Sequence, residues 1–494
     1  MNFKTNIIRL TVCCVVLVSS SCSKFLDLEP ETFRTDQNFW QSQDDAELAI
    51  SGGYALLRQS LNYAAGVTHF AYGDLPSDEF VNASGEDWND IVTMNWSLAI
   101  DATQTHRRMM RQRRYDLFYR VVDQSNRVLA FVPEIPTSAF ESETVKNRIL
   151  GEAYFLRAFT YFYMARVWGG VPLVLQSESP VDAVDVAQAS EQEVLEQVLR
   201  DIDLAKPLLQ WGDASADDRA VRANKGALMA LEAHLHAWRG DYAACAVAAD
   251  SVIARGGYAY VSRENYLRIF EGQSVEGIFE ISQNKANEGT TAGIGNYSLR
   301  EPYLVGITAV PNIRLVPETI AAFFGEDRAS DLRFANAFDE VSFPSNPMCI
   351  KYANVDYQPA TATSAAVRVF KNNIVIFRYA DLKLLLAEAL AATGRDDAAR
   401  LVLNEVRAQA GLGEWEGTGT LIEAVFAERG RELFLEGHRY YDQVRMARHH
   451  GFFTFGNKMS AAEFQAGKYV WPFDPTILNL NKKLTQNAFW SSKL

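Results

Sequence analysis

The sequence predicts a mainly α-helical fold, and two features carry this prediction. The first is segment 148–175, RILGEAYFLRAFTYFYMARVWGGVPLVL, in which apolar residues recur at steps of three and four. The second is a pair of alanine-rich segments, 225–256 and 379–411, each with the pattern of two helices joined at a glycine. Antiparallel helical pairs stacked around an apolar central helix are therefore expected.

The central helix is expected to be buried on two sides. One apolar face carries Ile149 and Leu156, and a second carries Phe155 and Phe159. A helix that is apolar on two sides must lie between other helices. Gly169 is expected to end it, because glycine readily adopts the left-handed conformation found at helix ends.

Other helices are expected on both sides of this segment. Ser190 with Glu193 three residues later forms a capping-box pattern that predicts a helix over 190–209. Helical periodicity also predicts helices over 36–61, 115–132 and 421–445.

Three stretches lack a helical period. Residues 62–105 and 284–307 are rich in glycine and polar residues, and are expected to form long loops, which often carry function. The tail after residue 470 is expected to wrap over the surface.

The two alanine-rich segments resemble tetratricopeptide hairpins. Ala233 and Ala387 each lie seven residues before a turn glycine, Gly240 or Gly394, and small residues there allow two helices to approach closely. Because the segments are far apart in sequence, they indicate a solenoid interrupted by insertions. The alternative is two unrelated helical hairpins.

Residues 1–21 have the pattern of an export signal. A basic start with Lys4 and Arg9 precedes a short apolar run, and Ser19-Ser20-Ser21 stands directly before Cys22. Small residues before a cysteine resemble a bacterial lipobox, so Cys22 is the expected lipidation site. The alternative is a secretory signal cleaved near Ser21.

Composition narrows the class of protein further. The chain has 494 residues, a net charge of −13 and 12% aromatic residues. An acidic balance is unfavourable for a nucleic-acid partner. Of the cysteines beyond Cys22, Cys245 and Cys349 could form one disulfide, but are expected to be small buried hydrophobic residues.

Several segments, taken in order, resemble the SusD/RagB family of nutrient-uptake lipoproteins. They are FLDLEP at 25–30, GEAYFLRAFTYFYMARVWGGVPLV at 151–174, FRYADLKLLLAEAL at 377–390, NEVRAQAGL at 404–412, ERGRELFLEGHRYYDQVR at 428–445 and WPFDPTILNLNKKLTQN at 471–487. The chain departs from the usual family pattern at Tyr115, where tryptophan is usual, and at Trp471-Pro472-Phe473.

The resemblance implies a SusD-like fold: a signal peptide at 1–21, a lipidated tether at 22–35 and one helical domain at 36–494. The N-terminal part of that domain would be 36–256 and the C-terminal part 257–494. It also implies a surface-exposed lipoprotein, anchored in the outer membrane, that captures oligosaccharides and passes them to a SusC-like TonB-dependent transporter. A peptide-capturing RagB-type protein with the same role is the alternative. No catalysis, cofactor or metal is implied.

The loop-rich stretch before Tyr115 is the expected ligand surface. Sugar rings pack on aromatic planes, while their hydroxyls need amides and carboxylates. The candidates are Trp88, Asn89, Asp90, Asn95 and Trp96, with Tyr297 from the second loop. The alternative for Trp88 and Trp96 is packing in the core.

Two charged stretches remain open to more than one interpretation. His106 to Arg114, HRRMMRQRR, fits either an anionic glycan site or a solvated or partner-facing surface. A second cluster could suit acid–base work, but its interleaved arginines favour an internal ion-pair network. Its members are Glu428, Arg429, Arg431, Glu432, Glu436, His438, Arg439, Asp442 and Arg445.

Overall fold

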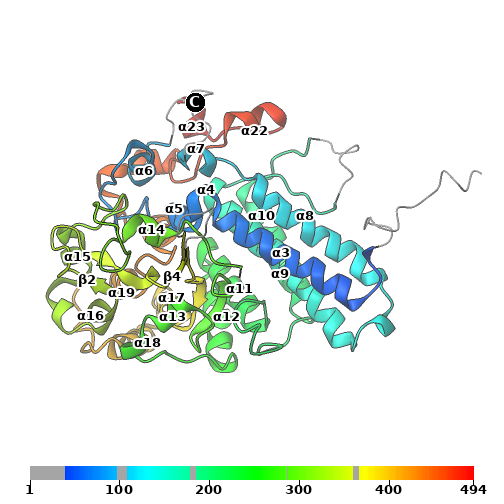
Figure 1. Cartoon of the computed structure of the whole chain (residues 1–494), viewed down its shortest axis with the longest axis horizontal. Coiled ribbons are helices and arrows are strands. Elements are labelled where there is room, and N and C mark those ends of the chain that lie inside the picture. The colour runs from blue at the N-terminus through cyan, green and yellow to red at the C-terminus, as the bar shows by residue number, and fades with distance from the viewer. Residues whose placement is uncertain (1–38, 97–107, 178–184, 286, 360–366, 494) are drawn as a thin grey trace, which may run out of the picture.

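The computed structural model describes residues 39–96, 108–177, 185–285, 287–359 and 367–493. The signal 1–21, the tether 22–35 and Cys22 lie outside the described residues, as do His106 and Arg107. Figure 1 shows long helices on one side of the molecule, and shorter helices with small strands on the other. The prediction of a mainly helical fold is confirmed.

In the described part of the N-terminal half, one long α-helix is followed by four short ones and then by five more long ones. The first is α3 (Gln43–Leu61), and the short ones are α4 (Tyr63–Gly66), α5 (Thr68–Gly73), α6 (Glu86–Val92) and α7 (Arg108–Gln112). The five later long helices are α8 (Asp116–Phe131), α9 (Glu143–Trp168), α10 (Glu191–Ala205), α11 (Lys225–Arg239) and α12 (Tyr242–Arg255).

The C-terminal half begins with short elements and continues with helices. The short helices are α13 (Arg268–Glu271), α14 (Ile294–Ser298), α15 (Pro317–Phe324) and α16 (Leu332–Ala337). The strands are β1 (Gly277–Ile281), β2 (Phe338–Asp339), β3 (Met348–Cys349), β4 (Val355–Gln358), β5 (Val367–Phe370) and β6 (Ile374–Arg378), which pair antiparallel as β1–β6, β2–β3 and β4–β5. The last helices are α17 (Tyr379–Ala392), α18 (Asp396–Gln409), α19 (Leu421–Glu432), α20 (Arg439–His449), α21 (Ala461–Gln465), α22 (Pro475–Leu480) and α23 (Ala488–Ser491).

Helix α9 lies at the centre of the long helices, as its two apolar faces predict. It packs against α8, α10 and α3, and from Gly151 to Trp168 only Tyr154 is partly exposed. It begins before the predicted start, because the Ser142 hydroxyl caps its first turn by accepting from Val145 N. It ends at Gly169, whose φ is 75°.

The two predicted helical pairs stack directly on each other. Helices α11 and α12 form one pair, α17 and α18 form the other, and α12 packs against α17. Units that are separated in the sequence are therefore consecutive in space, which favours the interrupted solenoid over two unrelated hairpins.

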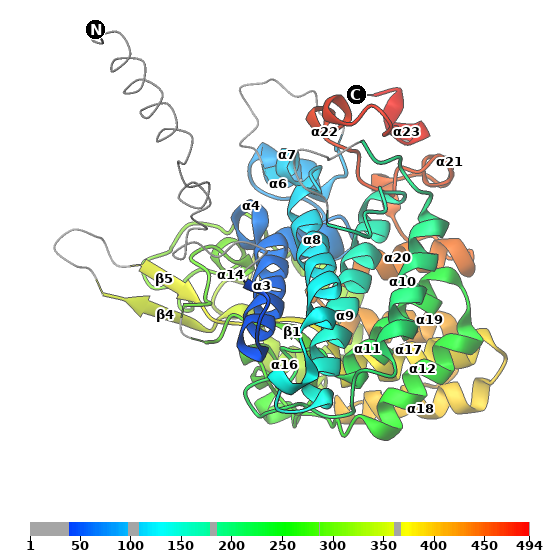
Figure 2. The same ribbon diagram turned by 90° about the vertical axis from the view of Figure 1, so that its right-hand side faces the viewer.

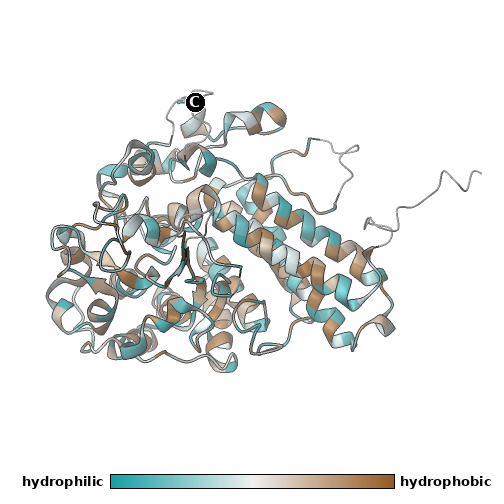
Figure 3. Cartoon of the chain, viewed as in Figure 1, coloured by the Kyte–Doolittle hydropathy of each residue, from teal (hydrophilic) through white to brown (hydrophobic). Residues whose placement is uncertain are grey.

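The core is continuous along the chain. One hydrophobic cluster includes buried residues from Ala46 in α3 to Trp490 in α23, and it contains Cys245 as well as Cys349. Both cysteines are free and buried, as predicted. Figure 3 shows hydrophobic and hydrophilic residues alternating along α3 and α8, as expected for helices with one face on this core.

Several expectations are wrong in detail. The segments 62–105 and 284–307 are not simply loops, because the first contains α4, α5 and α6 and the second contains α14. The segment 421–445 is not one helix, because α19 ends at Glu432 and α20 begins at Arg439. The tail does not merely cover the surface: Trp471 is 2% exposed and Trp490 is 1% exposed, so both rings belong to the core. Sequence periodicity cannot detect such short helices, nor single rings that enter a core from a loop.

Candidate functional site

Three segments that are far apart in the sequence meet around Trp88. The ring of Trp88, in α6, lies 4.8 Å from the ring of Tyr297, in α14. The guanidinium of Arg108, at the start of α7, lies 4.6 Å from the Trp88 ring centre and 5.2 Å from that of Tyr297. The structure thus unites two predicted ligand residues with an arginine of the basic stretch.

Asp87 holds this arrangement in place. Its carboxylate accepts hydrogen bonds from the backbone N–H of Arg108 at 2.9 Å and of Met109 at 3.1 Å, and it pairs with the Arg108 guanidinium at 3.2 Å. Asp87 therefore ties α6 to the first turn of α7 and fixes Arg108 over Trp88. Because Trp88 is only 3% exposed, Arg108 and Tyr297 form the accessible part of the cluster.

Trp96 lies elsewhere, in the core. Its ring stacks on Trp471 with centres 4.1 Å apart, and its N–H donates to the Ile91 carbonyl at 3.2 Å. With one face and its N–H occupied and no exposed surface, Trp96 fits the packing alternative in this conformation.

The remaining candidates support the loop around α6. The Asn89 side-chain oxygen accepts from Ala83 N at 3.2 Å, and Asn95 donates to the Asp90 carboxylate at 3.1 Å. Asp90 is buried. The role of these residues in ligand contact stays a prediction.

A polar ribbon, which the sequence does not predict, lies beside Tyr297. Ala83 pairs antiparallel with Ile313, and Ile313 N donates to the Tyr297 carbonyl at 2.9 Å. The polar ribbon consists of the neighbours on both strands, Asn82, Ser84, Asn312 and Arg314. All four are at least partly exposed. No local signal identifies it, because the pairing joins segments 230 residues apart.

The polar ribbon offers closely spaced donors and acceptors. Arg314 donates to the Ser84 hydroxyl at 3.1 Å and to the Asn82 side-chain oxygen at 3.3 Å, while the Asn312 amide donates to the Ser84 carbonyl at 3.3 Å. A guanidinium has five N–H donors, so Arg314 retains capacity for a ligand. Amides, a hydroxyl and arginines beside an aromatic ring can bind a molecule rich in hydroxyl groups.

Most described arginines of the basic stretch are engaged within the protein. Arg113 has no exposed surface and donates to the Trp96 carbonyl, while its own carbonyl accepts from Asp474 N at 3.1 Å. Arg114 pairs with Asp116 at 2.9 Å. Arg111 lies over Tyr63, 5.8 Å from its ring centre. The stretch is therefore neither a uniformly solvated helix nor one continuous anion site.

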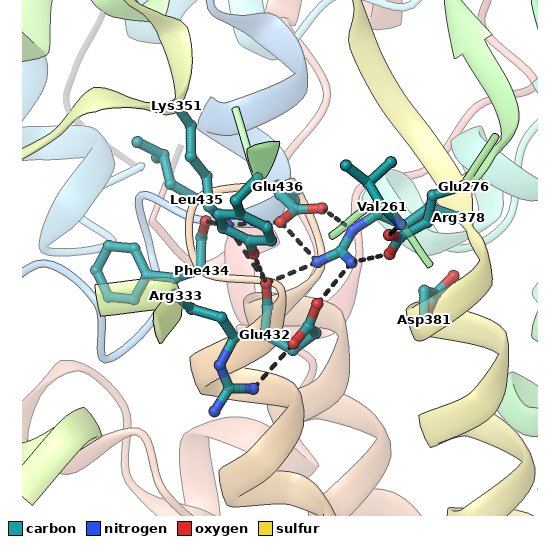
Figure 4. A network of polar contacts seen from close by, with 12 residues as sticks. Val261, Glu276, Arg333, Lys351, Arg378, Asp381, Glu432, Phe434, Leu435 and Glu436 are labelled. Atoms are coloured by element: carbon teal, nitrogen blue, oxygen red, sulfur yellow. Dashed lines mark hydrogen bonds and ion pairs between the residues drawn. The ribbon is translucent and has the colours of Figure 1, made fainter. Parts of the chain in front are cut away.

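The cluster at 428–445 forms part of a buried ion-pair network, as predicted (Figure 4). Arg378 donates to Glu276, Glu432 and Glu436, each at 2.7 Å, and Arg333 binds Glu432 at 2.9 Å. The network joins β6, α16 and the end of α19.

The carboxylates of this network are unsuited to donating protons near neutral pH. Burial alone would raise the pKa of Glu428, but Arg333 and Arg431 outweigh burial and lower that pKa to about 2. Burial is likewise outweighed at Glu432, whose pKa is held well below its usual range by Arg263, Arg378 and Arg333. General acids work best with a pKa near the working pH, so these glutamates fit a structural role.

The comparisons with known proteins all point to the same family. The model of the SusD family matches residues 335–490, and a model described as "Starch-binding associating with outer membrane" matches residues 24–236. SusD-like protein P38 of Formosa agariphila is 29% identical over 475 residues, covering 87% of this chain and 88% of the relative.

Solved structures share the fold over nearly the whole chain. A SusD homologue of Bacteroides thetaiotaomicron is 25% identical with a TM-score of 0.78, covering 92% of this chain and 100% of that one. A laminarin-binding SusD-like protein is 21% identical with a TM-score of 0.73, covering 91% and 99%, a likeness that shows the fold.

The two matching models cover separate parts of the chain, and the curated relative and the solved structures span both parts. We conclude that the chain belongs to the SusD family.

Proposed function

We propose that this protein is a non-catalytic, surface-exposed lipoprotein that captures oligosaccharides and delivers them to a SusC-like TonB-dependent transporter in the outer membrane. Arg108 over Trp88 and Tyr297, next to the polar ribbon, is the observation that carries the capture step. The aromatic edge suits the C–H face of a sugar ring, and the amides and arginines suit its hydroxyls.

The membrane location rests on the N-terminal pattern. Lipid attached to Cys22 would hold the chain to the outer membrane, and the tether at 22–35 would separate the anchor from the folded part. Among the described helices, none has the length and apolar character needed to cross a bilayer. The lipid anchor and the transporter partner are both part of the proposal.

Titration calorimetry of the purified lipid-free protein tests the capture step. The ligands are neutral oligosaccharides from starch and laminarin, acidic oligosaccharides, and a peptide pool. We expect binding of oligosaccharides without turnover. We also expect Arg314→Ala to weaken it about tenfold, since it removes several donors at once.

Arg120→Ala is the matched control, because Arg120 is exposed on α8 and lies outside the polar ribbon. It should bind as the wild type does. Binding of peptides but of no oligosaccharide would show that the peptide-capturing alternative is correct. Product formation from a saccharide would contradict the non-catalytic role.

A further inference from the structure

Three cavities adjoin one another, and the second and third lie along α3. The first, of about 230 Å³, lies between the start of α9 and the 209–214 segment. The second, of about 270 Å³, lies between the middle of α3 and the end of β1. The third is an open depression of about 620 Å³ between the end of α3 and residues 288–291. Neighbouring cavities share wall residues, so we call the three together the α3 groove.

The cavities adjoin one another at shared wall residues. Asp218 and Arg222 border the first and second cavities, while Ala55, Arg58 and Glu288 border the second and third. Small residues of α3 line the middle and open end of the groove, among them Ser51, Gly52 and Ala55. Residues 51–62 of an α-helix span about 17 Å, so the groove has room for an extended chain. Figure 2 shows the α14 and β4–β5 region beside α3.

The arginines on the walls are paired with carboxylates. Arg58 binds Glu288 at 2.9 Å, and Arg222 and Arg148 both bind Glu152 at 2.8 Å. Such pairs keep hydrogen-bonding capacity on their outer atoms but present little net charge. The walls therefore suit a neutral ligand with many hydroxyl groups better than a polyanion.

Aromatic rings lie at intervals along the groove. Trp211 is partly exposed at the first cavity, where its indole N–H is buried and has no hydrogen-bond partner among the described residues. Tyr54 lines the second cavity. An aromatic ring with charged side chains beside it is the combination that binds a sugar ring and its hydroxyls.

The wall opposite α3 offers no strand edge for a peptide at β1. On one side β1 pairs with β6, and on the other Glu280 N donates to the Ala220 carbonyl at 2.7 Å. Extended peptides are commonly bound by adding a strand to a free sheet edge. The groove thus favours an oligosaccharide over a peptide.

The open end of the groove is connected to the candidate site. Thr290 and Thr291 line the third cavity, and a few residues later the chain forms α14, which carries Tyr297. A Cβ at Gly66 would lie 1.4 Å from the Ala292 carbonyl oxygen, so α4 fixes this connecting segment by direct backbone contact. One segment therefore forms a wall of the groove and positions the ring of the candidate site.

We propose that the α3 groove is a second binding site that holds an extended neutral oligosaccharide, separate from the surface around Tyr297. The proposal rests on the proposed glycan-capturing function. It implies that long oligosaccharides bind more tightly than short ones, because only a long chain fills the groove.

Blocking the middle of the groove tests the proposal. Ala55 is exposed and is shared by two cavities, so Ala55→Trp should fill the groove without disturbing the core. Leu48→Trp is the matched control, since Leu48 is 57% exposed on the same helix and lines none of the three cavities. Gln59→Trp, at an exposed position of the third cavity, is a second blocking variant.

Titration calorimetry with trisaccharides and octasaccharides from starch and laminarin gives the readout. The wild type and Leu48→Trp should bind the octasaccharide more tightly than the trisaccharide. Ala55→Trp and Gln59→Trp should lose this preference, with octasaccharide affinity falling about tenfold, while melting temperatures stay unchanged.

Each other outcome is informative. Octasaccharide affinity that is unchanged in both blocking variants, together with loss of binding in Arg314→Ala, would overturn the groove and leave the proposed function standing. If the blocking variants lose only peptide binding, the groove is a peptide site and the proposal is wrong. A wild type that binds no oligosaccharide would overturn both.

Discussion

Glu280 combines complete burial with an incomplete set of partners. One of its carboxylate oxygens accepts from Gln273 N and from the Asn373 amide, both at 2.8 Å. The other oxygen is buried and has no hydrogen-bond partner among the described residues. Burial raises the pKa of Glu280 from 4.5 to about 7, although the two hydrogen bonds oppose this shift. A charged Glu280 therefore weakens the fold.

Glu280→Gln should increase stability in a pH-dependent manner. The folded pKa lies above the unfolded value of 4.5, so the protonated group imposes no ionisation penalty below pH 4.5. The free energy of unfolding falls as the pH rises from 4.5 toward 7. Above pH 7 Glu280 is ionised in the folded protein, and the full cost of its buried charge remains. At pH 8 the variant should gain about 1–3 kcal/mol in free energy of unfolding, with little gain at pH 4.5.

Urea denaturation at both pH values measures this gain. Glu414→Gln, at an exposed position, is the matched control and should change stability little at either pH. An equal gain for Glu280→Gln at pH 4.5 and pH 8 would show that ionisation is not the cause.

At the scale of elements, the contact between α4 and the segment before α14 links the groove to the candidate site. Ala64, Ala65 and Gly66 have φ values of 52°, 73° and 77° in succession, so the chain turns sharply at the end of α3. This turn brings the Gly66 backbone against Ala292. The position of Tyr297 therefore depends on a glycine in another element.

Gly66→Ala should destabilise the protein and weaken ligand binding. The left-handed backbone costs a non-glycine residue about 1–2 kcal/mol, and the clash with Ala292 adds about 1–3 kcal/mol. Gly306→Ala isolates the first effect, because Gly306 has a φ of 76° and open space around its missing Cβ. Urea denaturation compares the two variants, and equal losses would exclude the clash.

At the scale of the whole molecule, the stacked helical pairs and the buried ion-pair network form one packed unit that carries the proposed binding surfaces. Helices α11, α12, α17 and α18 pack in succession, and Arg378 joins the β1–β6 sheet to the end of α19. A packed unit of this kind suits capture and transfer, because binding then requires little ordering of the protein.

Cys22→Ser should release the protein from the membrane. A multiply acylated cysteine gives durable anchoring, which the variant would lack. In cells, the wild type should incorporate labelled palmitate and sediment with outer membranes. The variant should do neither. Cys245→Ser is the control and should incorporate as much labelled palmitate as the wild type. Incorporation of labelled palmitate by Cys22→Ser would contradict the anchor.

The helical class and several helix boundaries follow from the sequence alone. The capping box at Ser190 and Glu193 is present as predicted, α9 ends at Gly169, and Arg431 pairs with Glu428 one turn away in the 428–445 cluster. These features depend on neighbours within a few turns of one chain segment. Local periodicity and capping therefore suffice to predict them.

Which residues form the candidate site follows from contacts between distant segments. Three contacts illustrate this: Ala83 pairs with Ile313, Arg108 lies over Trp88, and Trp96 stacks on Trp471. Each contact joins two segments whose local sequence patterns do not predict that they meet. The sequence could not distinguish the accessible ring of Tyr297 from the buried ring of Trp96. The physical reason is that exposure is set by what packs on a residue from elsewhere in the chain, and no local pattern records that contact.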